Sequence, residues 1–293
     1  MTLPLSQLRV ESTLVQVPVS VRDKSGRPVN DLTQDQFTIV EDKVPQQITL
    51  FKHEDAPMSI GLVIDNSGSM RNKRERVNSA ALTFVRESNP DDETFIVNFD
   101  DSAYIGQDFT GSIGDLMDAL DSFNSRGETA LYDAIYLSVD KATKQGRRES
   151  KALLLVSDGV DNRSKYKYED VLKKLKESRV TMYAIGLSEE NEPRGFFKTA
   201  PAKKAQETLV TLAEASGGVA YFPKSLDEVE VLCKQIAHDF RNRYTLGYSS
   251  TNTKPDGTWR EVKVTITPAK VIAAKLETPR HKPGYFAPTA AKP

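Results

Sequence analysis

The stretch IGLVIDNSGS, residues 60–69, decides the fold of this 293-residue chain. Residues 60–64 form an apolar run without polar alternation, which is typical of a strand buried on both faces of a parallel sheet. The run ends at Asp65, where a polar loop containing glycine begins. Ligands of open parallel sheets bind beyond the carboxyl ends of the strands. Asp65 and the hydroxyl groups of Ser67 and Ser69 therefore lie where a site is expected.

Similar apolar runs, each typical of a buried strand, recur further along the chain. Amphipathic segments with helical spacing separate the apolar runs, which fall at residues 95–99, 152–156, 182–187 and 219–222. Buried strands that alternate with helices predict an α/β domain with a doubly wound parallel sheet covered on both faces. The last helical pattern carries Cys233, the only cysteine, on its apolar side, so we expect a buried thiol and no intrachain disulfide.

Both ends of the chain are rich in strand patterns instead. Predicted strands lie at 13–21, 37–40 and 48–51, with Pro45 in the link between the last two, and again at 244–248, 262–266 and 271–276. Neither set is large enough to form its own core. We therefore expect residues 1–56 and 244–293 to form one small β-sandwich into which residues 57–243 are inserted.

Composition excludes several classes of function. A formal net charge of -1 produces no overall electrostatic attraction to nucleic acid or to an anionic membrane. No apolar stretch approaches the roughly 20 residues of a transmembrane helix. Residues 1–9 lack a basic end followed by an apolar run, so no signal peptide is expected in this chain. Three scattered histidines and one cysteine argue against a zinc cluster.

Two other loops are predicted to reach the edge of the sheet where Asp65 lies. Thr129 opens a helical pattern, and Asp158 directly follows the apolar run 152–156. With Ser67 and Ser69, these residues supply two carboxylates and three hydroxyls, all oxygen ligands, which suit Mg²⁺, with Mn²⁺ or Ca²⁺ as alternatives. Few charged ligands would leave the ion with positive charge and an open position for an acidic partner.

Each element of this set also has a structural explanation. Asp65 and Ser67 alone are also explained as caps of the following helix that bind no metal. Asp133 lies just inside a predicted helix start, where an acidic side chain is favoured by the helix dipole. Asp161 is expected in a loop or as a helix cap, and its alternative role is to support the metal site without binding the ion. Asp100 and Asp101 are expected in a solvated turn. The long connection 188–204 is either a loop at the site edge that shapes partner choice or a disordered insertion.

The residues carry a resemblance to a known family. Asp65-x-Ser67-x-Ser69 after a buried strand, Thr129 in a Gly-x-Thr-Ala-Leu context and Asp158 in Ser-Asp-Gly resemble the metal-ion-dependent adhesion site of von Willebrand factor type A domains over about residues 58–243. The resemblance implies that the hydroxyls are direct or switchable ligands and that the two carboxylates often act through water. It also implies that the last helix, about 226–243, can shift when the site is occupied.

The flanking strands resemble those of bacterial proteins that surround such a domain with strand-rich ends. The resemblance rests on Asp23-x-x-Gly26-x-Pro28-Val29, on Tyr244-x-Leu246-Gly247-Tyr248 and on a closing Pro283-Gly284-Tyr285. It implies an extracytoplasmic location, secreted or periplasmic.

Three functions remain open from the sequence. The first is a binding module, not an enzyme, that captures an Asp or Glu carboxylate of a protein partner through the cation. The second is a phosphatase of the haloacid dehalogenase type with Asp65 as nucleophile, although Ser67 stands where that motif has its acidic proton donor. The third is a structural scaffold that binds no metal.

Overall fold

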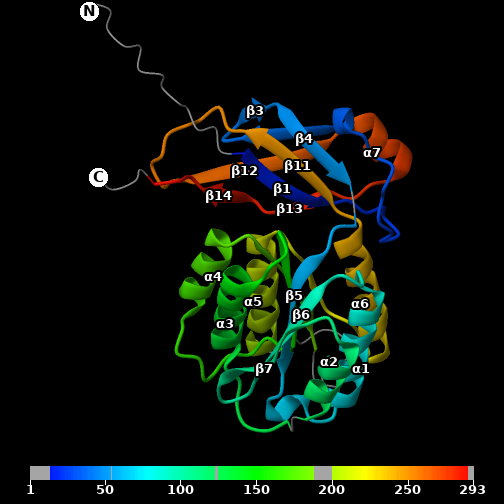
Figure 1. Cartoon of the computed structure of the whole chain (residues 1–293), viewed down its shortest axis with the longest axis vertical. Helices are drawn as coiled ribbons and strands as arrows, with labels where there is room; N and C mark the ends of the chain where they lie inside the picture. Colours follow the sequence, from blue (N-terminus) through cyan, green and yellow to red (C-terminus); the bar gives the residue numbers. More distant parts are fainter. Residues whose placement is uncertain (1–13, 54, 123–124, 188–199, 290–293) are drawn as a thin grey trace, which may run out of the picture.

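A computed structural model describes residues 14–53, 55–122, 125–187 and 200–289. Figure 1 shows an antiparallel β-sandwich stacked on an α/β domain, and the chain crosses between them twice. The fold class expected from the sequence is confirmed: a mostly parallel sheet flanked by helices, with separate antiparallel sheets built from both ends of the chain. The domain boundaries after residues 56 and 243 stay a prediction.

The central sheet has six strands in the order β10-β9-β8-β5-β6-β7. Five of them are parallel: β5 (Met58–Asp65), β6 (Glu93–Phe99), β8 (Ser150–Ser157), β9 (Val180–Gly186) and β10 (Ala220–Tyr221). The sixth, β7 (Ala103–Thr110), pairs antiparallel with β6 at the edge. Every residue of β5 is buried, and the ring of Phe95 occupies the space beside Gly61, where a Cβ would come within 2.5 Å of the ring.

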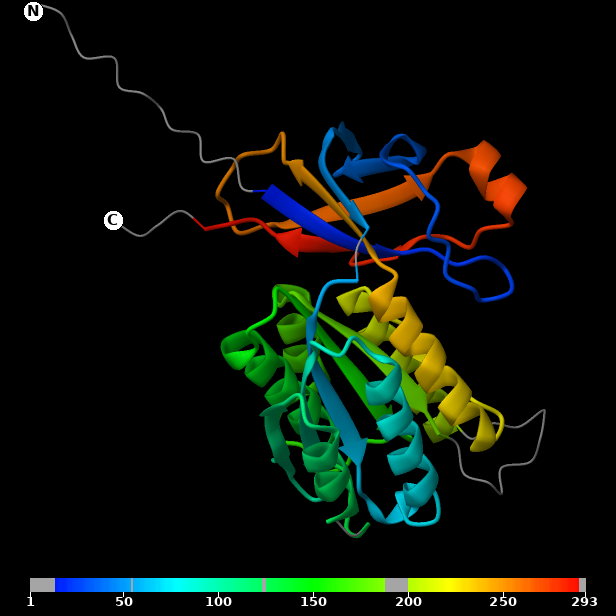
Figure 2. The ribbon, with the colours of Figure 1, turned by 45° about the vertical axis from the view of Figure 1, so that its right-hand side comes forward.

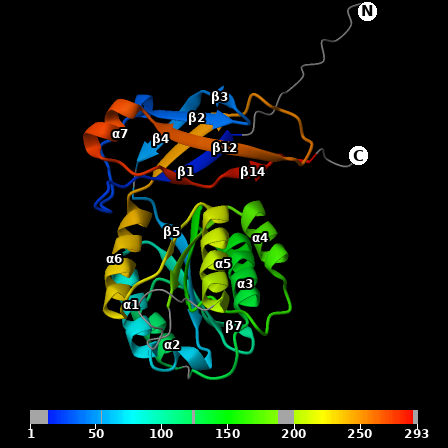
Figure 3. The ribbon, with the colours of Figure 1, turned by 180° about the vertical axis from the view of Figure 1, so that it is seen from behind.

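Helices cover both faces of this sheet, as Figures 1 and 3 show from opposite sides. The face packed against α1, α2 and α6 and the face packed against α3, α4 and α5 form two separate apolar clusters. The helices are α1 (Arg74–Glu87), α2 (Ile113–Asp121), α3 (Leu131–Gln145), α4 (Tyr168–Glu177), α5 (Ala200–Ser216) and α6 (Asp227–Arg241). Cys233 is fully buried in α6 as predicted, and burial raises the pKa of its thiol to about 12.

The sandwich contains two four-stranded antiparallel sheets, ordered β13-β1-β11-β4 and β14-β12-β2-β3. Their strands come from the start of the chain, β1 (Leu14–Ser20), β2 (Phe37–Glu41), β3 (Val44–Gln46) and β4 (Ile48–His53), and from its end, β11 (Tyr244–Ser249), β12 (Trp259–Ile266), β13 (Arg280–His281) and β14 (Gly284–Phe286). The buried carboxylate of Glu41 joins the two sheets, because it accepts hydrogen bonds from Tyr248 in one (2.6 Å) and Tyr285 in the other (2.9 Å).

Two local predictions are wrong. Residues 271–276 were expected as a strand, but α7 (Pro268–Ala274) covers most of them: Pro268 begins the helix and Lys275 ends it in the left-handed conformation. Pro45 was expected in a link, but it lies within β3. That strand is at the edge of its sheet, where a missing N–H costs no ladder hydrogen bond.

The sandwich lies at the end of the central sheet where the parallel strands begin. Figure 2 shows β5 leaving the sandwich and running toward the opposite end of the α/β domain. Across this junction Arg22 of the sandwich forms a buried ion pair with Asp239 of α6, and the ammonium group of Lys282 donates to the carbonyls of Leu175 (3.1 Å) and Lys176 (2.6 Å) at the end of α4. No helix in the described ranges is both long and apolar enough to cross a membrane.

Candidate metal centre

The first loop of the site follows β5 at the edge of the sheet farthest from the sandwich. Asp65, the last residue of β5, is buried, and its Oδ1 accepts a hydrogen bond from the backbone N–H of Ser67 (2.9 Å). This short turn leads into a 3-10 turn, Gly68–Met70, and then into α1. The hydroxyl of Ser67 does not cap that turn, so the capping explanation does not apply to Ser67.

A continuous line of oxygen atoms connects this loop to the end of β8. The hydroxyls of Ser67 and Ser69 are 3.1 Å apart, and the Ser69 hydroxyl donates to Oδ2 of Asp158 (2.7 Å). On the buried side, the Ser157 hydroxyl donates to Oδ2 of Asp65 (2.6 Å). Four of the five predicted ligands, Asp65, Ser67, Ser69 and Asp158, are thus joined by hydrogen bonds within one cluster.

Thr129 arrives on a neighbouring loop and is held there by backbone contacts. The N–H of Gly68 donates to the carbonyl of Gly127 (3.1 Å), and the N–H of Thr129 itself donates to the side chain of Asn162 (2.8 Å). Thr129 is buried. Within the described part of the chain, no hydrogen bond joins its hydroxyl to the other four residues, although its loop contacts theirs through Gly68 and Gly127.

The electrostatics of the cluster favour a cation. Burial, and then the charge of Asp158, raise the pKa of Asp65 to about 6, although hydrogen bonds from Ser157 and Ser67 act in the opposite direction. Among the described residues no Lys or Arg side chain forms an ion pair with either carboxylate. No group of three or more His, Cys, Asp or Glu side chains there could hold a metal by itself. The donor set is therefore two carboxylates with hydroxyls, which fits a hard divalent cation.

Several residues that shape the site were assigned no such role from sequence. Asp101 was expected in a solvated turn, yet its Oδ1 accepts the N–H of Glu128 (2.9 Å), and its carboxylate occupies the space where a Cβ on Gly127 would lie. Gly127 also has a φ of +75°, which explains glycine at this position. Asn162 is the second such residue, since its side chain fixes Thr129. Their only sequence signal was their position just beyond strand ends.

The remaining acidic candidates hold loops together. Asp133 accepts the N–H groups of Lys165 and Tyr166 (both 2.9 Å), so it anchors the segment after Asp158 to the start of α3. Asp161 caps α3 by accepting the N–H of Tyr132 (3.2 Å). Of the long connection 188–204, residues 188–199 lie outside the described residues, and α5 begins at Ala200.

Comparison with known proteins identifies the α/β domain. Residues 60–160 match the family model for the von Willebrand factor type A domain. A von Willebrand factor type A protein from Catenulispora acidiphila has 11% identity over 89% of this chain and 76% of its own, with a TM-score of 0.52. No curated protein matches the sequence.

Two further solved structures share the fold. The vWF domain of the type V pili tip protein Mfa5 from Porphyromonas gingivalis has 11% identity over 62% of this chain and 94% of its own, with a TM-score of 0.51. The pilus adhesin SpaC from Lactobacillus rhamnosus GG, in its open conformation, has 12% identity over 86% of this chain and 48% of its own, with a TM-score of 0.53. The family match over residues 60–160 and these shared folds together show that the α/β part of this chain has the von Willebrand factor type A fold.

Proposed function

We propose that the protein is a binding module that captures an acidic group of a protein partner through a divalent cation held by Asp65, Ser67, Ser69, Thr129 and Asp158. The observation that carries the proposal is the hydrogen-bonded cluster in which two carboxylates and two serine hydroxyls meet without a described basic partner. Ser69 is exposed at this edge, which gives a partner access.

The chemistry of the donors supports Mg²⁺ over softer metals. All the proposed ligand atoms are oxygen, and Mg²⁺ typically binds one or two carboxylates and keeps several exchangeable water ligands. A bound ion would supply positive charge for a partner's Asp or Glu carboxylate. Charge-assisted contacts of this kind are short and strong.

The relatives support a binding role of the adhesion type. SpaC is a pilus adhesin and Mfa5 is a pilus tip protein. We extend to this chain only the general role, together with an extracytoplasmic location, and we leave the identity of the partner open.

The phosphatase alternative fits the geometry less well. A nucleophilic aspartate must present a carboxylate oxygen to the substrate. Asp65 is only 2% exposed, which leaves a substrate little access to its carboxylate. Ser67 also supplies no proton at the position of the missing general acid. We therefore propose that the domain is not an enzyme.

A thermal melt with and without metal separates a metal-binding module from a metal-free scaffold. If the dissociation constant is about 1 mM, 10 mM Mg²⁺ stabilises the native state by roughly 1.4 kcal/mol, which raises Tm by about 3–5 °C for a domain of this size. We expect Ser69→Ala and Asp158→Ala to abolish the shift. Ser164→Ala is the matched control, because its hydroxyl belongs to the Asp161 loop and not to the cluster, and it should keep the shift.

A pull-down tests the capture of a partner. Immobilised protein should retain a partner in Mg²⁺ and release it in EDTA, and Ser67→Ala should retain none. Equal retention of the partner in Mg²⁺ and in EDTA would show that binding does not depend on the cation. A melt without a shift for Mg²⁺, Mn²⁺ or Ca²⁺ at 10 mM would favour the scaffold.

A further inference from the structure

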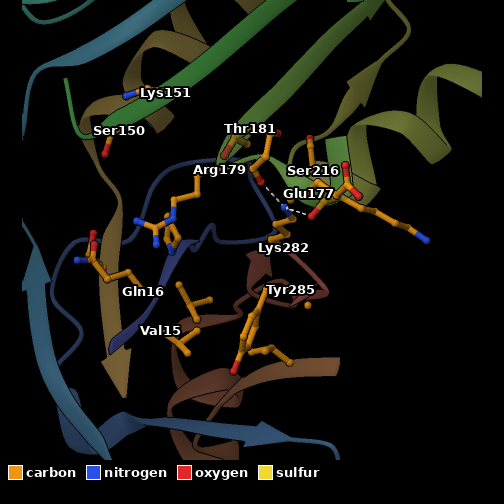
Figure 4. Close-up of a pocket in the computed structure, with 18 of the residues that line it drawn as sticks. Val15, Gln16, Ser150, Lys151, Glu177, Arg179, Thr181, Ser216, Lys282 and Tyr285 are labelled. Carbon is orange, nitrogen blue, oxygen red and sulfur yellow. Dashed lines mark hydrogen bonds between the residues drawn. The ribbon is translucent and has the colours of Figure 1, made fainter. Parts of the chain in front are cut away.

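A cleft of about 390 Å³ lies between the sandwich and the α/β domain, at the opposite end of the sheet from the metal centre. Figure 4 shows Val15, Gln16 and Tyr285 of the sandwich facing Ser150, Lys151 and Thr181 of the α/β domain across it. Ser150 begins β8, whereas Asp158 directly follows the end of that strand. An eight-residue strand spans about 26 Å, so the cleft and the metal centre are separate sites.

The cleft carries an excess of positive charge. Five basic and two acidic side chains line it: Lys151, Lys176, Arg179, Arg243 and Lys282, with Glu149 and Glu177. Both acidic residues are exposed, and Glu177 is paired outside this group with Lys173. Burial is the larger cause that lowers the pKa of Lys282 to about 8, and repulsion from the nearby charge of Arg179 adds to it.

Among the described basic side chains that line the cleft, Arg243 is the one with a buried nitrogen that has no hydrogen-bond partner. One of its terminal nitrogens donates to the Thr181 hydroxyl (3.1 Å), but its Nε is buried and has no partner. The nearby carboxylate of Asp239 is already engaged by Arg22 through both oxygens. Within the described ranges no acid forms an ion pair with Arg243. Lys282, by contrast, is satisfied by carbonyl groups at the end of α4.

The sandwich side of the cleft is mostly apolar. Val15 and Val17 of β1 and the ring of Tyr285 line it, together with the polar side chains of Gln16 and Thr245 and the ammonium group of Lys282. The hydroxyl of Tyr285 is engaged by Glu41, so only its ring is free to contact a ligand. Pockets of 300–1,000 Å³ with apolar walls and a few convergent polar groups are typical of small-molecule sites.

We propose that this cleft binds a small organic carboxylate, whose charged head pairs with Arg243 and whose apolar body lies against Val15, Val17 and Tyr285. A carboxylate matches the planar fork of a guanidinium group and would satisfy the buried Nε. A neutral ligand would leave that charge unpaired.

Octanoate, used below its micellar concentration, is a suitable probe, with 1-octanol as the uncharged control of equal chain length. The fluorescence of Trp259, the only tryptophan, can follow binding without a variant, because its ring packs against Gly284 at the rim of the cleft. We expect octanoate to bind with a Kd of about 1 mM or tighter and 1-octanol at least tenfold more weakly.

Substitution at the guanidinium tests the assignment. Arg243→Gln should weaken octanoate at least tenfold and leave 1-octanol unchanged. If Arg243→Gln does not fold, as judged by circular dichroism, Arg243→Lys replaces it and should weaken octanoate several-fold, because a point charge cannot form the bidentate pair. Ser69→Ala, at the metal centre, should leave octanoate binding unchanged, in Mg²⁺ or EDTA.

Three results would overturn the proposal. They are no binding of octanoate up to 5 mM, equal binding of octanoate and 1-octanol, or tenfold tighter binding of octyl phosphate, which would assign the cleft to phosphate esters. Because the readout does not involve metal, a failure here leaves the metal-dependent function standing, and loss of metal binding leaves this proposal standing.

Discussion

The buried ion pair between Arg22 and Asp239 is expected to be the main electrostatic connection between the sandwich and the α/β domain. Nε of Arg22 is 2.7 Å from Oδ1 of Asp239, and the two side chains are 3% and 1% exposed. The substitution Asp239→Asn keeps the shape but removes the charge that neutralises Arg22. Removing one partner of a buried pair typically costs about 3–5 kcal/mol, because the remaining charge stays desolvated. We expect a loss of that size in the free energy of unfolding.

Urea denaturation followed by two probes measures this effect. Trp259 reports on the sandwich, and the helical circular dichroism signal reports on the α/β domain, which contains six of the seven α-helices assigned in the described residues. In the wild type the two transitions should coincide if the junction couples the domains. In Asp239→Asn we expect both a lower stability and separate transitions, because the junction is weakened more than either core.

Two controls isolate the buried charge. Arg76→Gln, on α1, removes an exposed ion pair to Asp227, which lies on the same helix as Asp239. The two side chains are 63% and 77% exposed, so the loss should cost less than about 1 kcal/mol. The double variant Arg22→Met with Asp239→Leu should recover most of the loss, because two apolar groups need no counter-charge. A loss below 1 kcal/mol in Asp239→Asn, or a double variant no more stable than the single one, would refute the reasoning.

Two other predictions concern backbone fit and pH. Gly217 and Gly26 have nearly equal positive φ values, +86° and +83°, but a Cβ would meet the backbone nitrogen of Lys282 at 2.5 Å in the first and the flexible end of Gln235 at 3.1 Å in the second. Gly217→Ala should therefore cost about 1–3 kcal/mol more than Gly26→Ala in thermal or urea unfolding, and equal costs would contradict this packing. Burial raises the pKa of Asp92 to about 6, so the folded chain holds this proton more tightly than the unfolded chain does. Its contribution to stability is present below about pH 4 and is lost as the pH rises through 6. The stability difference between wild type and Asp92→Asn should change only in that window, and a constant difference from pH 3.5 to 7.5 would rule the titration out.

The parts of the fold that the sequence predicted share one property, which is a strong local pattern. Residues 60–64 have no polar member, so only a strand buried on both faces accommodates them. Strand β7 lacked such a signal, because it lies at the sheet edge and mixes polar with apolar residues. Residues 271–276 carry β-branched side chains typical of a strand, but Pro268 fixes a helical start that local propensity alone does not outweigh.

In the site too, the residues with a local sequence pattern were predicted, and the contacts between distant segments were not. Asp65, Ser67 and Ser69 were predicted because they follow one strand within five residues, and Asp158 because it follows another. One contact that orients Asp65 comes from Ser157, which lies beside the predicted ligand Asp158 but donates its hydrogen bond to a carboxylate 92 positions away. A pairing of that range has no local signature, so only the folded structure displays it.

The pairing of β4 with β11 has a mechanical consequence. His53 and Tyr244, where the chain enters and leaves the α/β domain, are register partners, and their rings stack 4.5 Å apart. A pull applied between Leu14 and Thr289, the two ends of the described chain, would therefore load the sandwich first. The inserted domain would bear tension only after this β-ladder had been unzipped. A partner held at the far edge of the α/β domain would, until then, be shielded from strain along the main chain.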